Sequence, residues 1–287
     1  MVDKTNKMGI FLMTLSALFF SIIQVIVNVT GDRIPLMEQV FFRNIVSLAI
    51  CFVVIKRNRL SMFGEKKYQP LLFVRSGFGL LGLVSLFYAA SRAAQADVTI
   101  LSKLSPFLIT IFAYLFLKEQ IAKIQVPALF IAFGGAFFVV NPVFQSNPFP
   151  LFIAFLCALF SSVSYTLLAY FKDKVDGMTV IMHFSTFCAV VSLPFFISDF
   201  TLPSLTDFFL LLLIGICGGC GQISLTYAYR VAPASEVSIY NYSGILFSAL
   251  LGYLVLGETL SASSLLGGAL VILASFLTFR YSKHPVE

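Results

Sequence analysis

The chain has no tryptophan and few charged residues. Only 11% of its 287 residues are Asp, Glu, Lys or Arg, against about 25% in an average soluble domain. Five cysteines are too few for a disulfide scaffold in a chain of this length, and no Walker motif indicates ATP hydrolysis within the chain. Hydrophobic residues make up 59%, against about 45–50% in soluble proteins. These proportions exclude an ordinary soluble domain and a disordered chain, and indicate a protein whose solvent is lipid.

Apolar runs separated by turn or charge signals follow one another along the whole chain. Ten spans of roughly 20 residues each would leave only about eight residues for each loop or terminus, so no room remains for a soluble domain. We therefore expect an all-α membrane protein with ten transmembrane helices. The expected spans are 8–28, 36–55, 71–91, 96–117, 125–141, 149–171, 178–198, 207–228, 234–256 and 261–280.

Positive charge is distributed unevenly over the segments between these spans. With the N-terminus inside, fourteen lysines and arginines fall in inner segments and only two, Arg33 and Arg92, in outer ones. Because cytoplasmic loops carry an excess of Lys and Arg, both termini are expected in the cytoplasm. The net charge of +6 then reflects topology, and no nucleic-acid partner is needed to explain it.

The two halves of the chain resemble each other in sequence. A shift of 139 residues aligns Tyr88-Ala89 with Tyr227-Ala228, and a shift of 141 aligns Ala17-Leu18-Phe19 with Ala158-Leu159-Phe160. Five helices per copy is an odd number, so the second copy enters the membrane from the opposite side. Inverted repeats are typical of alternating-access transporters. The expected repeats, within one integral membrane unit, are residues 1–143 and 144–287.

Two related segments, Tyr88–Val98 and Tyr227–Val237, carry a family resemblance. They resemble the EamA-type repeat of the drug/metabolite transporter superfamily, and the resemblance spans essentially the whole chain. It implies ten helices, cytoplasmic termini and a central cavity lined largely by helices 1, 3, 4, 6, 8 and 9. The family transports amino acids, sugars, nucleotides, organic anions and drugs, so the resemblance names no cargo. One departure is that Ser105-Pro106 becomes Gly244-Ile245 in the second copy, so the ninth helix lacks the kink-prone proline of the fourth.

Charged groups within the expected spans are the first candidates for a binding site, because a charge at the centre of a lipid-exposed helix costs about 2.5–3.5 kcal/mol. Lys103 lies seven residues into the fourth helix, and its repeat equivalent is Tyr242, so a cation and a phenol are expected to face each other. Together with Arg43 and Arg75, Lys103 favours an anionic or zwitterionic cargo. A structural or gating role stays open for the two arginines, which match arginines common across the family. Snorkelling or pairing with Asp97 stays open for the lysine.

We expect Lys103→Ala to abolish binding of an anionic cargo while leaving the protein folded. Polar residues on neighbouring expected helices extend this candidate site, although such residues also tie helices together. The candidate cargo-binding residues are Lys103, Tyr242, Asn241, Tyr240, Thr99, Ser102, Gln222, Tyr165, Arg75 and Arg43.

Three carboxylates are candidates for coupling or gating. Asp97 and Glu236 occupy equivalent places at the starts of the fourth and ninth helices, and Glu38 enters the second helix from outside. The first two either interact with a helix N-terminus or carry a coupling proton, and Glu38 is either a rim charge or a proton carrier. If they couple transport to protons, Asp97→Asn or Glu236→Gln weakens the pH dependence of transport.

Two motifs are discounted. Gly77–Gly82 matches the dinucleotide-binding pattern G-x-G-x-x-G, but no strand precedes it and it lies inside an expected membrane helix. Cys217 and Cys220 have metal-like spacing, yet no second ligand pair accompanies them. We therefore expect no metal and no cofactor. His183 is interpreted as a packing residue, with a proton relay as the alternative.

The leading hypothesis is a secondary active transporter of a small polar metabolite, most simply a carboxylate or an amino-acid-like compound, coupled to protons or working by exchange. Alternatives are a carrier of a cationic or neutral metabolite or drug, an intramembrane enzyme acting on a lipid, and a channel. Two histidines and scattered carboxylates offer no catalytic constellation, so no enzymatic activity is expected. The expected partners are a small-molecule substrate, membrane lipid and protons, and the expected location is the bacterial cytoplasmic (inner) membrane.

Overall fold

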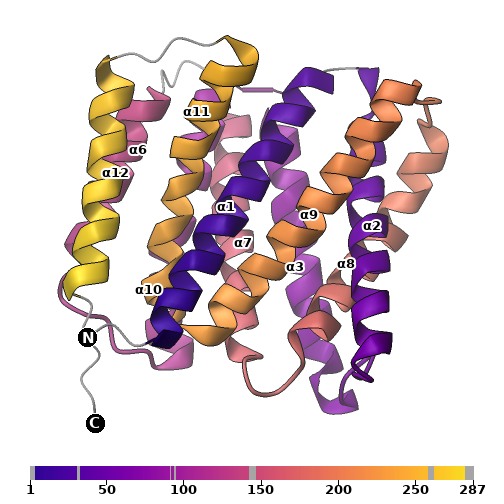
Figure 1. Ribbon diagram of the computed structural model, residues 1–287, viewed down its shortest axis with the longest axis horizontal. Coiled ribbons are helices and arrows are strands. Elements are labelled where there is room, and N and C mark those ends of the chain that lie inside the picture. The colour runs from indigo at the N-terminus through magenta and orange to yellow at the C-terminus, as the bar shows by residue number, and fades with distance from the viewer. Residues whose placement is uncertain are drawn as a thin grey trace.

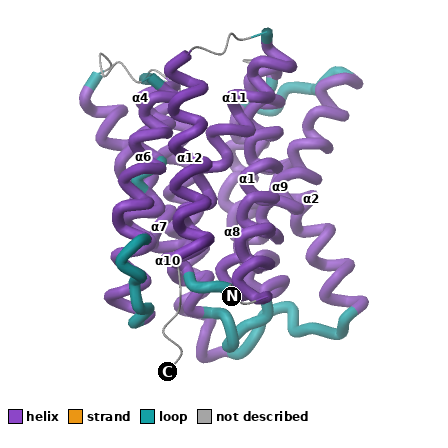
Figure 2. Tube along the Cα trace, turned by 60° about the vertical axis from the view of Figure 1, so that its left-hand side comes forward, coloured by secondary structure: helices purple, strands orange, loops and turns teal. Residues whose placement is uncertain are grey.

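The computed structural model describes residues 4–30, 33–90, 92–93, 95–141, 147–257 and 262–281. These residues form one bundle of helices, and no strand occurs among them (Figure 1, Figure 2). The first turn of the first helix and the last turn of the last helix lie at the same end of the bundle (Figure 1). In chain order the elements are α1 (Lys4–Thr30), α2 (Leu36–Arg57), η2 (Lys66–Tyr68), α3 (Gln69–Ala90), α4 (Gln95–Ser102), α5 (Ser105–Phe112), η3 (Ala113–Leu117), α6 (Gln125–Val140), α7 (Pro148–Tyr170), α8 (Gly177–Ser198), α9 (Leu205–Val231), α10 (Ala234–Val237), η4 (Ser238–Tyr242), α11 (Ser243–Leu256) and α12 (Ala262–Tyr281).

Within the described part of the chain, nine helical stretches are long and apolar enough to cross a membrane. The all-helical, membrane-spanning class predicted from the sequence is therefore confirmed. The expected span 125–141 corresponds to α6, which has 16 residues. At 1.5 Å per residue α6 rises about 24 Å, somewhat less than the roughly 30 Å of a bilayer core.

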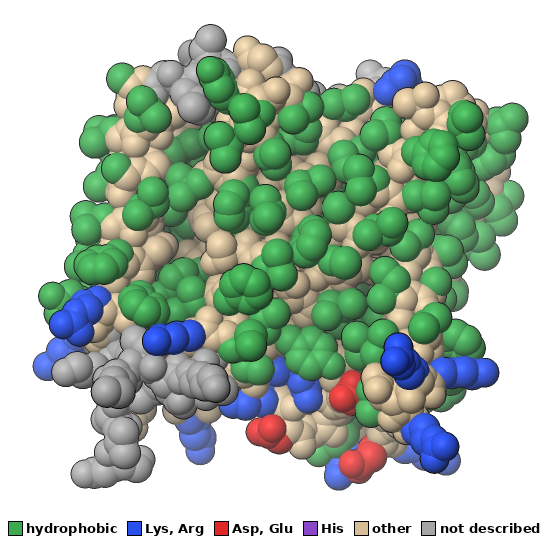
Figure 3. Space-filling model, viewed as in Figure 1, with side chains coloured by type: hydrophobic (Ala, Val, Ile, Leu, Met, Phe, Trp, Pro, Cys, Tyr) green, Lys and Arg blue, Asp and Glu red, His purple; other side chains and the backbone are tan. Residues whose placement is uncertain are grey.

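The surface of the bundle matches this class. Large apolar side chains stand in the open, among them Phe116 at 70% exposed, Leu254 at 65% and Phe130 at 64%. Figure 3 shows hydrophobic side chains over the middle of one face, with Lys and Arg gathered along its lower edge. Soluble monomers rarely expose a continuous apolar surface of this kind, whereas lipid accommodates it.

Two of the expected spans, 96–117 and 234–256, are interrupted. In the first, α4 ends at Ser102 and a turn at Lys103 and Leu104 precedes α5; in the second, the 3₁₀ stretch η4 separates α10 from α11. A shift of 139 residues places one interruption on the other. The ninth span is thus interrupted although it has no proline. Ser243 donates its hydroxyl hydrogen to the Tyr240 carbonyl (2.6 Å) and competes with helical bonding there.

The same hydrogen bond holds both interruptions. The Ser162 hydroxyl on α7 lies 3.1 Å from the carbonyl oxygen of Ser105, and the Ser21 hydroxyl on α1 lies 2.9 Å from that of Gly244. Each hydroxyl shares its one hydrogen with the carbonyl one turn back on its own helix, that of Ala158 or Ala17. Ser21 and Ser162 are related by the 141-residue shift, and Ser105 and Gly244 by the 139-residue shift. The first helix of each half thus supports the broken helix of the other half.

Helix pairs follow the same correspondence. α1 packs along α9 as α7 packs along α3, and the equivalent helices α6 and α12 pack on each other. Gly135 and Gly267 lie in the α6–α12 contact, where a Cβ atom built on Gly135 would stand 2.6 Å from the Gly267 carbonyl oxygen. α2 contacts both α8 and α9, which brings the middles of α2, α3, α7, α8 and α9 around one interior region.

Candidate functional site

The strongest candidate for a binding group is Arg75 on α3. Only 1% of its surface is exposed, and its guanidinium carbon lies 4.2 Å from the centroid of the Phe184 ring on α8. Its carbonyl accepts the hydroxyl hydrogen of Ser164 on α7 (3.0 Å), but its Nε and Nη1 have no hydrogen-bond partner within the described residues. A buried cation without an acceptor is costly, so these two nitrogens are available to an anion.

Arg43 on α2 lies in the same interior region. Its guanidinium carbon is 5.7 Å from the centroid of the Phe20 ring on α1, and its stem lies so close to Gly218 on α9 that a Cβ atom there would stand 2.7 Å from Cγ. Arg43 and Arg75 lie within electrostatic range of each other and of the Tyr165 hydroxyl. Neither arginine forms an ion pair with a described carboxylate.

Two tyrosines complete this cluster. The rings of Tyr165 on α7 and Tyr229 on α9 are stacked, with centroids 5.8 Å apart and planes at 23°. Tyr229 is 1% exposed, and its hydroxyl has no partner within the described residues. Sequence reasoning selected Tyr165 and missed Tyr229, although a tyrosine two residues after Tyr227 in an apolar helix was a usable signal. We call the cluster of Arg43, Arg75, Tyr165, Phe184 and Tyr229 the arginine site.

Lys103 and Tyr242 lie beside each other, although the phenol and the ammonium each bond to a main-chain carbonyl of the other interruption. The Tyr242 hydroxyl donates to the carbonyl of Lys103 (2.7 Å), and the Lys103 Nζ donates to the carbonyl of Asn241 (3.2 Å). Tyr242 is fully buried. Each interruption therefore bonds to the other, and this pair of contacts links the two broken helices.

The other predicted binding residues make local or interhelical contacts. The Tyr240 hydroxyl donates to a main-chain carbonyl of α12 (3.2 Å), and the Ser102 hydroxyl donates to the carbonyl of Thr99 (2.7 Å). The Gln222 amide lies 3.5 Å from a threonine hydroxyl one turn further along α9. Asn241 is partly buried and contributes its carbonyl to Lys103. None of these contacts joins the arginine site.

The candidate coupling carboxylates lie toward the ends of helices. Glu236 is 2% exposed and accepts a hydrogen bond from the Asn6 amide on α1 (3.1 Å). Glu38 is 1% exposed; its Oε2 accepts from the backbone N–H of Thr201 (3.3 Å), and its Oε1 has no partner in the described part of the chain. The side chain of Asp97 lies outside the described residues. Both described carboxylates thus contact an element distant in sequence.

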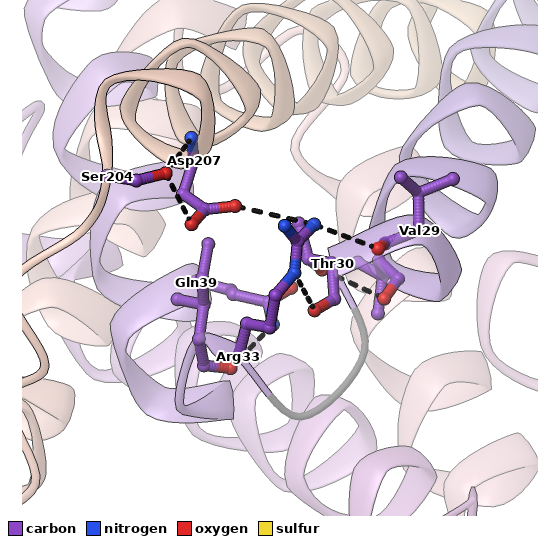
Figure 4. Close-up of polar contacts among 8 residues, drawn as sticks. Val29, Thr30, Arg33, Gln39, Ser204 and Asp207 are labelled. Atoms are coloured by element: carbon purple, nitrogen blue, oxygen red, sulfur yellow. Dashed lines mark hydrogen bonds and ion pairs between the residues drawn. The ribbon is translucent and has the colours of Figure 1, made fainter.

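A polar network joins the end of α1 and the start of α9, beside Gln39 (Figure 4). Arg33 Nη2 lies 3.4 Å from the Asp207 carboxylate, and the same guanidinium donates to the carbonyls of Val29 (3.1 Å) and Thr30 (3.2 Å). Ser204 caps α9 by accepting the N–H of Asp207 (3.2 Å) and donating to its carboxylate (2.7 Å). The network fastens the α1–α2 link to the start of α9, a contact that sequence reasoning missed.

Residues considered for metal or proton chemistry lie apart from one another. His183 Nδ1 is 2.9 Å from the Ser76 hydroxyl, and its ring meets that of Phe73 edge-on at 4.7 Å. Among the residues that the structure describes, no group of three or more His, Cys, Asp or Glu side chains is placed to hold a metal ion. His183 is thus packed and hydrogen-bonded at its site.

Comparison with known proteins extends this description. A solved crystal structure matches the fold with a TM-score of 0.85 at 17% identity, covering 96% of this chain and 97% of the other. The chain is 29% identical to the "Pseudopaline exporter CntI" of Pseudomonas aeruginosa, over 99% of this chain and 100% of that protein. It is 27% identical to the "S-adenosylmethionine uptake transporter" of Rickettsia bellii (98% and 96% covered), and 26% identical to the mouse "Solute carrier family 35 member G1" (93% and 77% covered).

The relatives are thus named as transporters, in bacteria and in a mammal. A family model described as the EamA-like transporter family matches residues 7–141 and again residues 148–280. Together the two matches span nearly the whole chain, so this protein belongs to the EamA-like transporter family of the drug/metabolite transporter superfamily.

Proposed function

We propose that the protein is a secondary active transporter of a small anionic or zwitterionic carboxylate, and that the arginine site binds the carboxylate. The observation that carries this proposal is the buried guanidinium of Arg75, whose Nε and Nη1 lack partners within the described residues. Nε and Nη1 lie on different edges of the guanidinium, so each is a separate charged donor that can form one hydrogen bond to a carboxylate oxygen. A bound carboxylate would supply the acceptors that the surrounding helices do not.

The rest of the arginine site favours the same cargo class. Arg43 adds a second positive charge. A cationic cargo would be repelled by two guanidinium groups in a region of low dielectric constant. The stacked Tyr165 and Tyr229 rings offer an apolar surface for the remainder of a small organic molecule.

We further propose that the chain works by alternating access with ten membrane spans and two inverted repeats, 1–143 and 144–287, with both termini in the cytoplasm. Equivalent interruptions near the middle of two spans support this proposal, because discontinuous helices mark the binding region of many carriers. α6 would supply the tenth span, since it packs along its equivalent α12. The inner membrane of a bacterium is the proposed location.

The relatives differ in the direction of transport that their names give, since one is named an exporter and another an uptake transporter. The carrier architecture therefore serves either direction. We propose that gradients set it, through protons or exchanged substrate.

The first test is a thermal-shift screen of detergent-purified protein against carboxylates, amino acids, nucleotides, sugars and organic cations. A ligand that binds the folded state raises its melting temperature, so carboxylates or zwitterions are expected to stabilise the protein. Arg75→Met is expected to remove this stabilisation. Because the Lys103 ammonium already bonds to the Asn241 carbonyl, Lys103→Met is now expected to reduce the stabilisation less, and not to abolish binding as the sequence alone led us to expect. Stabilisation by cations or neutral sugars alone would overturn the carboxylate site. If Lys103→Met alone lost the stabilisation by carboxylates, the carboxylate site would lie at the pair of helix interruptions instead.

Proton coupling gives a second test, at Glu236. Its carboxylate accepts a hydrogen bond from Asn6 of α1, and a proton on that oxygen would weaken the contact between α1 and α10. Glu236→Gln is therefore expected to flatten the pH dependence of transport into proteoliposomes, as is Asp97→Asn if the equivalent position acts alike. Glu65→Gln, at an exposed carboxylate paired with Lys67, is the control and should leave the profile unchanged. Superimposable profiles for Glu236→Gln and the unmodified protein would exclude Glu236 as a coupling group.

A further inference from the structure

A cavity of roughly 230 Å³ lies between α3, α7 and the end of the fourth span, and none of the five residues of the arginine site is among its lining residues. Val74 of α3, Phe112 of α5, Phe116 and Leu117 of η3, and Tyr170 at the end of α7 line it. Phe116 is 70% and Val74 42% exposed, so the cavity opens on the outer surface of the bundle.

The lining is suited to hydrocarbon and unsuited to a polar cargo. Thr166 is the lining residue of α7 that carries an aliphatic hydroxyl, and that hydroxyl donates to the carbonyl of Ser162 (2.8 Å), which leaves it no hydrogen to donate. A cavity walled by apolar groups does not hold ordered water, but it can bind an apolar group. Its position on a lipid-facing surface makes an acyl chain the available apolar group.

The backbone at this cavity also departs from the second half of the chain. Residues Ala113–Leu117 form a single π-helical turn, whereas the left-handed residue that follows it, Lys118 (φ 56°), has a left-handed equivalent in Gly257 (φ 69°). The equivalent residues of α11 continue as α-helix to Leu256. A π turn inserts extra backbone and is frequently found at functional positions, and here it carries two of the lining side chains.

Lysines stand at the end of the cavity that faces the loops. Lys118 follows Leu117 directly, and Lys172 and Lys174 follow Tyr170 in the turn after α7; all three are exposed. The Lys174 ammonium lies 3.2 Å from the centroid of the Tyr170 ring, so one of these charges touches a lining residue. Asp173 lies between two of these lysines, and Glu119 and Asp176 flank the same segments. Glu119 accepts hydrogen bonds from the backbone N–H groups of Ala234 and Ser235, and Asp176 from that of Met178, so both carboxylates are engaged with helix N-termini.

We propose that this cavity is a binding site for an anionic phospholipid, with an acyl chain between α3, η3 and α7 and the headgroup at Lys118, Lys172 and Lys174. Basic residues at a membrane surface each contribute about 1 kcal/mol to binding an anionic lipid, which corresponds to about fivefold in affinity. The lysines select the headgroup charge, and the apolar cavity fixes the position of one chain. The proposal rests on these contacts alone and is independent of the transported cargo.

The absence of tryptophan from the chain makes this site directly measurable. Phe116→Trp introduces a unique fluorophore in the cavity wall, and phospholipids brominated on their acyl chains quench it on contact. In proteoliposomes, phosphatidylglycerol is expected to bind at this position at least about fivefold more strongly than phosphatidylcholine with the same chains. Phe276→Trp, at a lipid-facing position of α12 that is 57% exposed, should show nearly equal quenching by the two lipids. Phe112→Trp is the second reporter if the first variant does not purify.

Two further variants separate the headgroup from the cavity. In the Phe116→Trp protein, exchange of Lys118, Lys172 and Lys174 for glutamine should reduce the preference for phosphatidylglycerol to that measured at Phe276→Trp. The double exchange Lys56→Gln with Arg57→Gln, at the end of α2, should leave the preference unchanged. Val74→Phe fills the cavity from its open side and should also remove the preference. Equal binding of the two lipids at both reporters would overturn the proposal. A preference that persists in Val74→Phe would overturn the placement of the chain in the cavity.

Discussion

Replacing Arg75 with methionine is expected to stabilise the cargo-free protein and to weaken carboxylate binding about 30-fold or more. The two effects have one cause, because the buried guanidinium lacks acceptors within the described residues until cargo supplies them. Exchanging buried ionic groups for apolar residues of similar volume is often neutral or stabilising by about 1–4 kcal/mol. Losing a buried charge-paired hydrogen bond costs about 2–5 kcal/mol of binding. Melting temperature without cargo and titration calorimetry with it measure the two effects separately.

Arg75→Lys is the control that separates charge from shape. It keeps the positive charge but loses the planar fork, so we expect binding between that of the methionine variant and that of the unmodified protein. A structural role for Arg75 predicts the opposite pattern, in which the methionine variant melts at a lower temperature without cargo and binds with unchanged affinity. That pattern would assign Arg75 to holding α3 against α8 through Phe184.

Among glycine-to-alanine substitutions at the described glycines, Gly267→Ala is expected to cause the largest loss of stability. A Cβ atom there would press on the Gly135 carbonyl oxygen and would stand 2.8 Å from the backbone nitrogen of Val139. Neither group is the end of a flexible side chain, so α6 and α12 would have to separate. Overpacking of this kind costs about 1–3 kcal/mol, and the melting temperature of the purified variant measures it.

Gly134→Ala is the matched comparison for this prediction. Gly134 precedes Gly135 on the same helix, and a Cβ atom there meets nothing within 4 Å. This variant is expected to be neutral or to gain up to about 1 kcal/mol, because alanine favours helix over glycine. If both variants melted alike, the close approach of α6 and α12 would not contribute to stability, and the proposed tenth span would lose its main support.

The class of the protein was predictable because composition reports the solvent that a chain requires. Few charges and long apolar runs exclude a water-soluble core, whatever the order of the helices. The repeat added geometry, since the equivalence of Lys103 and Tyr242 placed both at one pair of interruptions, where they do bond across. These features follow from counting and alignment, which need no knowledge of how each helix is rotated about its axis.

The arginine site was only partly predictable, for the same physical reason. Arg43, Arg75 and Tyr165 were recognisable as polar groups in apolar helices, but their convergence depends on the rotation and crossing of α2, α3 and α7. Tyr229 and Phe184 are aromatic residues among many, and only their contacts set them apart. The interruption of the ninth span was missed because hydroxyl-to-carbonyl bonds, and not a proline, produce it.

The matched bonds of Ser21 and Ser162 have a consequence for the energy of the resting protein. Since both halves use the same hydrogen bond at the same place, exchanging the roles of the halves changes neither the number nor the kind of these bonds. A preference between the two arrangements must then arise where the halves differ, as at Lys103 and Tyr242. Two states separated by only a few kcal/mol leave the minor one populated at about 0.1–10%. In the alternating-access cycle that we propose, duplication of one unit would supply near-degenerate states, and a few unmatched residues would set which of them the empty protein occupies.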